Sequence, residues 1–231
     1  MAVQSSKSLF KATKRKRKFG AALPMELPVQ EAPASAARRA DDFYPTGQPE
    51  AIRALLSRDW QRLEARADIW EPAVGDGALA RELVEAGFNV IGSDIVDRGW
   101  PKTALRSFYD YEMSPAETII TNPPFCEINA RDGHGRWLRH TLNMPNWDYC
   151  ALLLSWDWPA ARANGLGALL DAAPFSYSYL MRWKLDFTGE GSPPQRNAWF
   201  VWDRHHSGPP EFRWLDRVDN RQSTMALEGV A

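Results

Sequence analysis

Three residues, Gly75, Gly77 and Asp94, have the types and spacing to hold a nucleotide-like ligand. Glycines let the backbone turn tightly and approach a ligand closely. A carboxylate presents two acceptor oxygens in one plane, so Asp94 is suited to bind both hydroxyls of a ribose. The chain has neither the G-x-G-x-x-G pattern here nor a Gly-Lys-Ser/Thr phosphate loop. These residues therefore favour a nucleotide-like ligand without a pyrophosphate.

A second chemical feature is the stretch TIITNPPFCE, residues 118–127. An apolar run ends abruptly at an amide, two imides and an aromatic ring: Asn122, Pro123, Pro124 and Phe125. A proline restricts the residue before it to extended conformations, so Pro124 fixes the direction of the Pro123 carbonyl. The stretch predicts a buried strand whose end presents two acceptor oxygens in a fixed arrangement.

The elements around these residues predict a parallel sheet. Residues 47–68 form an amphipathic helix, with its apolar face formed by Ile52, Leu55, Leu56, Trp60 and Leu63. A strand (67–73), a glycine turn, a helix (78–87) and a second strand (89–95) then follow one another within about 25 residues. This order is that of a βαβ unit, in which the strands are parallel. The glycine turn and Asp94 both fall at the carboxyl edge of such a sheet.

The alternation continues along the chain and then changes. Further strands are predicted at 117–121 and 149–156, and further helices at 135–142 and 158–173. The last two strand-like runs are joined by only 11 residues, 186–196, which is too short for a standard crossover helix. We therefore expect an α/β fold, with a mostly parallel sheet that ends in an antiparallel C-terminal hairpin.

Charge and composition divide the chain into three parts. Residues 1–40 lack periodicity and are predicted to be a disordered basic leader, 41–203 the folded domain, and 204–231 a loosely structured C-terminal tail. The first 20 residues carry seven lysines and arginines and no acid, so the rest of the chain has a net charge of −8 within a total of −1. The basic leader could neutralise nucleic-acid phosphates, or it could simply be solvated.

Composition also excludes several classes of protein. No apolar run approaches the roughly 20 residues that span a bilayer, so no membrane association is expected. The two cysteines and four histidines show no zinc-ligand spacing, and no metal site is expected. Two cysteines and no secretory leader favour a cytoplasmic setting. Oligomeric state is not indicated.

The order EPAVGDG, GSDI and NPPF resembles the class I S-adenosylmethionine-dependent methyltransferases, specifically those that methylate an exocyclic amine such as adenine N6. The resemblance covers about residues 42–203. It implies a Rossmann-like, seven-stranded sheet with helices on both faces, and S-adenosyl-L-methionine as cofactor. The implied cofactor-binding residues are Phe43, Tyr44, Pro45, Thr46, Glu71, Pro72, Ala73, Gly75, Asp76, Gly77, Asp94, Ile95 and Asp110.

The resemblance also implies the catalytic roles. The Asn122 side-chain oxygen and the Pro123 carbonyl would accept hydrogen bonds from the two N–H groups of an amine. Pro124 would fix their geometry, and Phe125 would stack on the base. DNA adenine, flipped out of the duplex, is the implied substrate. An RNA amine and a protein glutamine remain alternatives, because each presents the same kind of N–H bonds.

Several residues keep a purely structural interpretation as well. Glu71 could simply end its strand, Asp76 could bond the amides of its own turn, and Asp110 follows a poorly defined strand. Cys126 is expected to be a small buried thiol rather than a nucleophile, because no catalytic base stands beside it. The polar segment 126–136 could be a lid or an ordinary loop.

Overall fold

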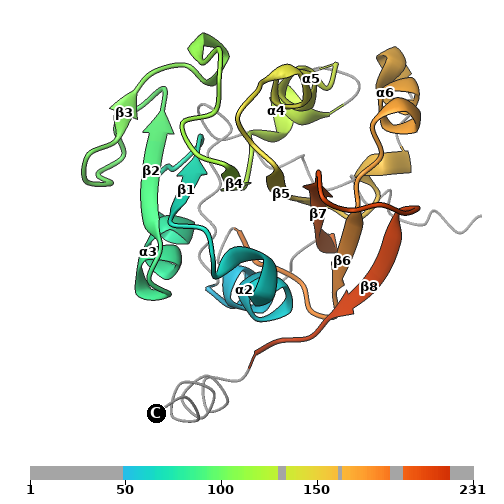
Figure 1. The fold of residues 1–231 in the computed structure, drawn as a ribbon, viewed down its shortest axis with the longest axis horizontal. Helices are drawn as coiled ribbons and strands as arrows, with labels where there is room; N and C mark the ends of the chain where they lie inside the picture. Colours follow the sequence, from blue (N-terminus) through green and yellow to red (C-terminus); the bar gives the residue numbers. More distant parts are fainter. Residues whose placement is uncertain (1–48, 130–133, 161–162, 188–194, 219–231) are drawn as a thin grey trace, which may run out of the picture. The chain divides into compact units, whose positions relative to one another are not determined.

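The computed structural model of the protein describes residues 49–129, 134–160, 163–187 and 195–218. Their strands form one sheet of eight, in the order β3-β2-β1-β4-β5-β7-β6-β8 (Figure 1). The strands in chain order are β1 (Asp68–Glu71), β2 (Asn89–Asp94), β3 (Ala104–Leu105), β4 (Thr118–Thr121), β5 (Tyr149–Ser155), β6 (Tyr177–Met181), β7 (Asn197–Asp203) and β8 (Glu211–Leu215).

The sheet is parallel except at one strand. β3, β2, β1, β4 and β5 pair in parallel, whereas β7 lies antiparallel between β5 and β6. The predicted parallel sheet with an antiparallel C-terminal hairpin is therefore confirmed. The strand number is eight rather than seven, because β8 pairs in parallel with β6 inside the predicted tail 204–231. The run EFRWL is short, and its aromatic residues Phe212 and Trp214 are exposed while only Leu215 is buried, so it does not resemble a core strand.

Helices cover both faces of the sheet, as expected. They are α2 (Glu50–Leu63), α3 (Ala78–Glu85), α4 (Phe125–Ile128), α5 (Arg136–Asn143) and α6 (Leu166–Ala172), with 3-10 turns η2 (Phe108–Asp110), η3 (Trp158–Ala160) and η4 (Ala163–Gly165). Figure 1 shows α2 and α3 on one face and α4, α5 and α6 on the other. Each layer packs its own apolar core against the sheet. Among the described residues, no helix is long and apolar enough to cross a bilayer.

The helix predicted over 158–173 is shorter than expected. Two 3-10 turns, η3 and η4, occupy its first part, and α6 begins only at Leu166. Asn164 and Gly165 have φ angles of 52° and 75°, in the left-handed region that a right-handed helix cannot continue through. Gly165 therefore marks the start of α6.

A buried aspartate organises the contact between α2 and the sheet. The helix kinks at Asp59, whose φ of −111° and ψ of 17° are not helical, and the side chain is fully buried. Its carboxylate accepts hydrogen bonds of 2.8 Å from the hydroxyls of Tyr149 and Tyr179 and from Arg62 Nη1. The kink turns Trp60, predicted to be buried, outward to 41% exposure.

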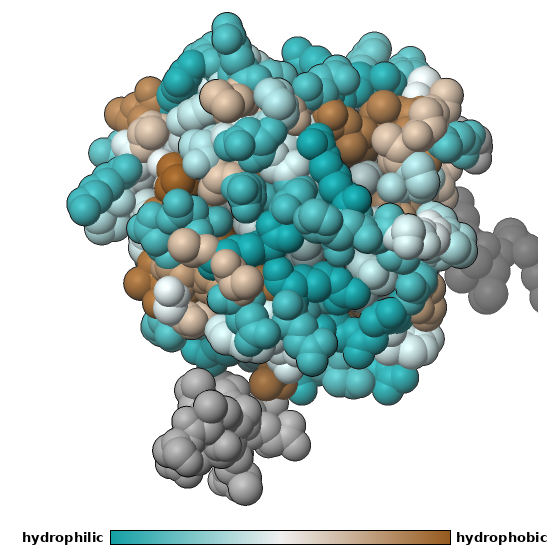
Figure 2. Space-filling model, in the orientation of Figure 1, coloured by the Kyte–Doolittle hydropathy of each residue, from teal (hydrophilic) through white to brown (hydrophobic). Residues whose placement is uncertain are grey.

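The exposed apolar side chains are scattered except at the β8 end of the sheet. The face in Figure 2 is mainly hydrophilic, with separate apolar areas. Phe212 and Trp214 of β8 are about half exposed, and Phe212 contacts Trp156, which follows β5, with ring centroids 5.4 Å apart. The aromatic core of the α6 layer therefore continues onto the surface at this edge.

We expect Asp59→Ala to destabilise the protein strongly. The substitution leaves two buried tyrosine hydroxyls without their acceptor and removes one of the partners of Arg62, so the free energy of unfolding should fall by about 3–5 kcal/mol. Urea unfolding followed by circular dichroism measures the change. The control is Asp157→Ala at an exposed position, which should shift stability by less than about 0.5 kcal/mol. Equal unfolding midpoints for the two variants would contradict the role of Asp59.

Candidate functional site

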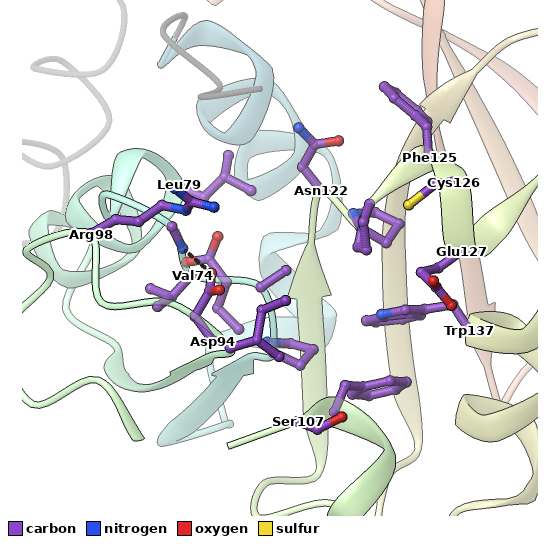
Figure 3. A pocket seen from close by; sticks show the side chains of 18 of the residues that line it. Val74, Leu79, Asp94, Arg98, Ser107, Asn122, Phe125, Cys126, Glu127 and Trp137 are labelled. Carbon is purple, nitrogen blue, oxygen red and sulfur yellow. Dashed lines mark hydrogen bonds between the residues drawn. The ribbon is translucent and has the colours of Figure 1, made fainter. Parts of the chain in front are cut away.

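A cavity of about 370 Å³ opens at the carboxyl ends of β1, β2 and β4. Figure 3 shows Asn122 and Phe125 at one end of it and Asp94 and Ser107 at the other. Its volume falls in the range of small-molecule sites, and its position at the carboxyl edge is where parallel α/β sheets bind ligands. The lining residues are Glu71, Pro72, Ala73, Val74, Gly75, Asp76, Ala78, Leu79, Asp94, Ile95, Arg98, Ser107, Phe108, Tyr109, Asn122, Pro123, Pro124, Phe125, Cys126, Glu127 and Trp137.

The loop after β1 is held in shape by Asp94 at the end of β2. The Gly75 amide donates to Asp94 Oδ2 at 2.9 Å, and the Val96 amide donates to Oδ1 at 3.1 Å. Gly75 has a φ of 56°, which the tight turn requires. Each carboxylate oxygen has a second lone pair, so Asp94 can still accept from a ligand on its cavity side. Asp94 thus shapes the loop as well as lining the cavity.

Three carboxylates, those of Glu71, Asp76 and Asp94, line the same part of the cavity. Glu71 is fully buried, and its burial together with the charges of Asp76 and Asp94 raises its pKa well above the usual range. Glu71 Oε2 accepts no hydrogen bond from any residue in the described part of the chain. A buried acceptor without a donor is costly. The arrangement therefore favours a ligand that brings a donor or a positive charge.

The structure supports the structural role of Asp76 as well. Its Oδ1 accepts the Ala78 amide at 3.1 Å, which caps the first turn of α3, while the side chain remains part of the cavity wall. Both interpretations of Asp76 are compatible with this position, because one carboxylate oxygen serves the helix and the other is left over.

The predicted polar residues lie directly after β4. Pro123 is buried and Asn122 is half-buried, and both line the cavity. Pro124 is extended, with φ −62° and ψ 122°, and it caps the one-turn helix α4 that begins at Phe125. Part of the segment 126–136, predicted to be a lid or a loop, is therefore helical. The two prolines carry the chain out of the sheet with little freedom at this point.

The wall below the polar end is aromatic, and the sequence did not predict it. Phe108 of η2 and Trp137 of α5 stack with ring centroids 4.0 Å apart and an interplanar angle of 8°. Ser107 caps η2 through a 3.3 Å hydrogen bond from the Tyr109 amide to its hydroxyl. In the stretch SFYDY, Ser107 could have indicated the turn, but the prediction was made for Asp110 instead.

The predicted residues have three different outcomes. Those that line the cavity are Glu71, Pro72, Ala73, Gly75, Asp76, Asp94, Ile95, Asn122, Pro123, Pro124 and Phe125. Gly77 and Asp110 are not among the lining residues, and Asp110 is exposed on η2. The predicted Phe43, Tyr44, Pro45 and Thr46 lie outside the described residues. The ligand-binding role of each residue stays a prediction, since position alone does not test it.

Gly77 has a packing reason rather than a place in the cavity. Its φ is 80°, and a Cβ there would lie 2.0 Å from Cε3 of Trp100. Trp100 also lies against Gly92 of β2, where a Cβ would meet its Cδ1 at 2.9 Å. The two glycines therefore let the Trp100 ring lie flat over the first βαβ unit.

Cys126 differs from its expectation. It is partly exposed and lines the cavity next to Phe125, whereas Cys150 is the fully buried thiol. The reason is local: α4 begins immediately after Pro124, and Phe125, Cys126 and Glu127 in its single turn line the cavity, whereas Ile128 is buried in the core. No group of three or more potential metal ligands occurs among the described residues.

Solved structures with the same fold come from methyltransferases and related systems. A Listeria monocytogenes protein assigned to the class I S-adenosylmethionine-dependent methyltransferases matches with a TM-score of 0.52 and 12% identity, over 82% of this chain and 71% of its own. A Vibrio vulnificus YJ016 protein assigned as a modification subunit of a type I restriction enzyme matches with a TM-score of 0.51 and 11% identity, over 82% of this chain and 53% of its own. The chain has this Rossmann-like methyltransferase fold.

A further solved structure is similar over a small part of its own chain. A DrdV–DNA complex determined by cryo-EM matches with a TM-score of 0.52 and 12% identity, over 80% of this chain but 29% of that one. The chain thus spans about half of the Vibrio subunit and under a third of the DrdV chain. No protein-family model and no curated protein matches the sequence.

We expect Glu71→Gln to stabilise the protein at neutral pH. A carboxyl whose pKa is raised in the folded state contributes nothing below its unfolded pKa of about 4.3, and it costs stability increasingly as the pH rises above that value. Removing the charge should therefore raise the free energy of unfolding at pH 7.5 and leave it unchanged near pH 4.

Urea unfolding of both proteins at the two pH values measures this difference. The exposed Glu117→Gln is the control, and it should follow the wild type at both pH values. A Glu71→Gln curve that parallels the wild type across this range would show that the buried carboxyl carries no such cost.

Proposed function

We propose that this protein transfers a methyl group from S-adenosyl-L-methionine to the exocyclic N6 amine of adenine in DNA. The observation that carries the proposal is the meeting of Asn122 and Pro123 with Glu71 and Asp94 in the wall of one cavity. The first pair suits an amine that is to be methylated, and the second pair suits a positively charged nucleoside. Both requirements of an amine methyltransferase therefore lie within one site.

The cofactor end of the cavity fits S-adenosyl-L-methionine on three counts. The Asp94 carboxylate can bind ribose hydroxyls, and Ile95, 63% exposed beside it, offers an apolar surface for a purine ring. The unfilled Glu71 Oε2 can accept from an ammonium group, and the neighbouring carboxylates of Asp76 and Asp94 favour positive charge. When bound, the cofactor would supply a methyl group: its C–S bond would break, the thioether S-adenosylhomocysteine would leave, and the methylated nitrogen would release one proton to water.

The substrate end works through acceptors rather than through a base. An adenine amine is a poor nucleophile because its lone pair is delocalised into the ring. The Asn122 oxygen and the Pro123 carbonyl would accept hydrogen bonds from its two N–H groups. These hydrogen bonds would draw the nitrogen toward tetrahedral geometry and stabilise the positive charge that develops there. Phe125 would hold the base by stacking, which makes positioning the main contribution.

DNA is favoured over the alternatives by the proteins that share the fold. The pair of acceptors at Asn122 fits any planar amine, so an RNA amine and a protein glutamine share this chemistry. Two proteins of the same fold are a restriction-modification subunit and a DNA complex, although another, from Pyrococcus horikoshii, is assigned as an RNA methyltransferase. Tritiated methyl transfer onto DNA, RNA and protein in parallel decides among the three substrates.

We expect Asn122→Ala to lose catalysis while keeping the cofactor. One of the two acceptors on the reacting amine disappears, so kcat should fall on the order of 100-fold, with the Kd for S-adenosylhomocysteine changed less than about twofold. Methyl transfer under saturating cofactor and isothermal calorimetry measure the two quantities. Asn143→Ala, at an exposed position in the last turn of α5, is the matched control. A normal kcat in Asn122→Ala would leave the residue as a strand terminator only.

A further inference from the structure

Glu127 joins three segments that each contribute to the cavity wall. Its Oε2 accepts a 2.6 Å hydrogen bond from the hydroxyl of Tyr109, and Arg136 Nη2 contacts both of its oxygens at 2.7 Å. Tyr109 belongs to η2, Glu127 to α4, and Arg136 is the first residue of α5. Tyr109 and Glu127 both line the cavity, so the three-residue contact is part of its wall.

The three segments carry the functional parts of the proposed site. α4 begins with Phe125, directly after the polar end of β4. η2 brings Phe108, and α5 brings Trp137, whose rings stack on each other. A helix of four residues has almost no stability of its own, so α4 depends on side-chain contacts to hold its position. Glu127 supplies hydrogen bonds from α4 to both other segments.

The chemistry of the contact favours a fixed geometry. Burial and the hydrogen bond to Glu127 raise the pKa of Tyr109, so its hydroxyl keeps its proton and remains a donor. Hydrogen bonds to a carboxylate are shorter and stronger than neutral ones. The Arg136 guanidinium also lies 5.8 Å from the centre of the Tyr109 ring, which adds a second contact between η2 and α5.

We propose that Glu127 is a positioning residue, which Tyr109 and Arg136 hold in place so that Phe125 and the end of β4 keep a fixed distance from the η2 wall. The proposal rests on the methyltransferase function proposed above. Glu127 touches neither reacting atom, and it acts through the helix that carries Phe125. Ser107, which caps η2, lies at the Asp94 end of the cavity, so the contact with Tyr109 links the substrate end to the cofactor end.

Exposure shows why this contact serves geometry more than overall stability. The side chain of Arg136 is 59% exposed and that of Glu127 is 23% exposed. Ion pairs with one partner in solvent contribute little to folding, because water screens them. In contrast, a small displacement of reacting groups can reduce catalysis by up to about 100-fold. Loss of the contact should therefore affect turnover far more than the melting temperature.

The test compares two variants that weaken the contact from opposite sides. Tyr109→Phe removes only the hydroxyl, and Glu127→Gln keeps the size of the side chain but removes its charge. We expect each to lower kcat on the order of tenfold with KM for nucleic acid changed less than about threefold, and the double variant to lower kcat by about the same factor as either single one, because the residues act as one unit. The control is Glu211→Gln, which breaks the comparable pair with Arg213 on β8 and should retain full activity.

Two readouts do not need turnover. The Kd for S-adenosylhomocysteine should rise about threefold or more in both variants, and amide hydrogen exchange in α4 should become faster while the strands stay protected. If the wild type methylates no substrate, the proposed function fails and these two measurements still decide the role of Glu127. The inference would be overturned, whatever the substrate, if both variants matched the wild type and Glu211→Gln in their Kd for S-adenosylhomocysteine and in the amide exchange rates of α4. For an active enzyme, it would also be overturned if the kcat losses of the single variants multiplied in the double variant.

Discussion

The parallel register of β2, β1 and β4 is the constraint on which the site depends. Glu71 pairs with Gly92 on one side, and Trp70 pairs with Ile119 on the other. Asp94 and Asn122 therefore both lie beyond the last residue of the strand between them, at the same edge. Strands in a sheet are about 4.8 Å apart, so this register brings the two side chains to opposite sides of one small cavity. An antiparallel β1 would have placed Glu71 at the far edge.

Two buried carboxylates show how differently the fold treats structure and site. Asp59 is surrounded by two tyrosine hydroxyls and an arginine, and it ties α2 to the sheet. Glu71 is equally buried but stands beside two other carboxylates, with one oxygen unfilled by any described residue. A protein tolerates such a local cost where a ligand can offset it. The contrast supports the predicted ligand-binding role of Glu71, which composition alone would not separate from the structural role of Asp59.

How far the sequence predicts the molecule depends on the range of the interactions involved. The glycine turn, Asp94 and the end of β4 were predictable, because local strand and turn patterns place them at one edge. Strand β8 was not, since its neighbour β6 lies 30 residues earlier and only Leu215 is buried. The burial of Asp59 depends on hydroxyls from β5 and β6, which no helical period reveals. The wall formed by Phe108 and Trp137 likewise joins residues distant in sequence.

The neutral amide at position 122 fits the charge of its surroundings. Glu71, Asp76 and Asp94 already line the cavity, and burial together with the charges of Asp76 and Asp94 raises the pKa of Glu71. A further carboxylate at the end of β4 would add to that repulsion and would tend to be protonated, which would turn one acceptor oxygen into a donor. An amide oxygen keeps its acceptor character at every pH. Asn122 therefore offers the acceptor that an amine requires without depending on the carboxylates that would suit a cationic cofactor.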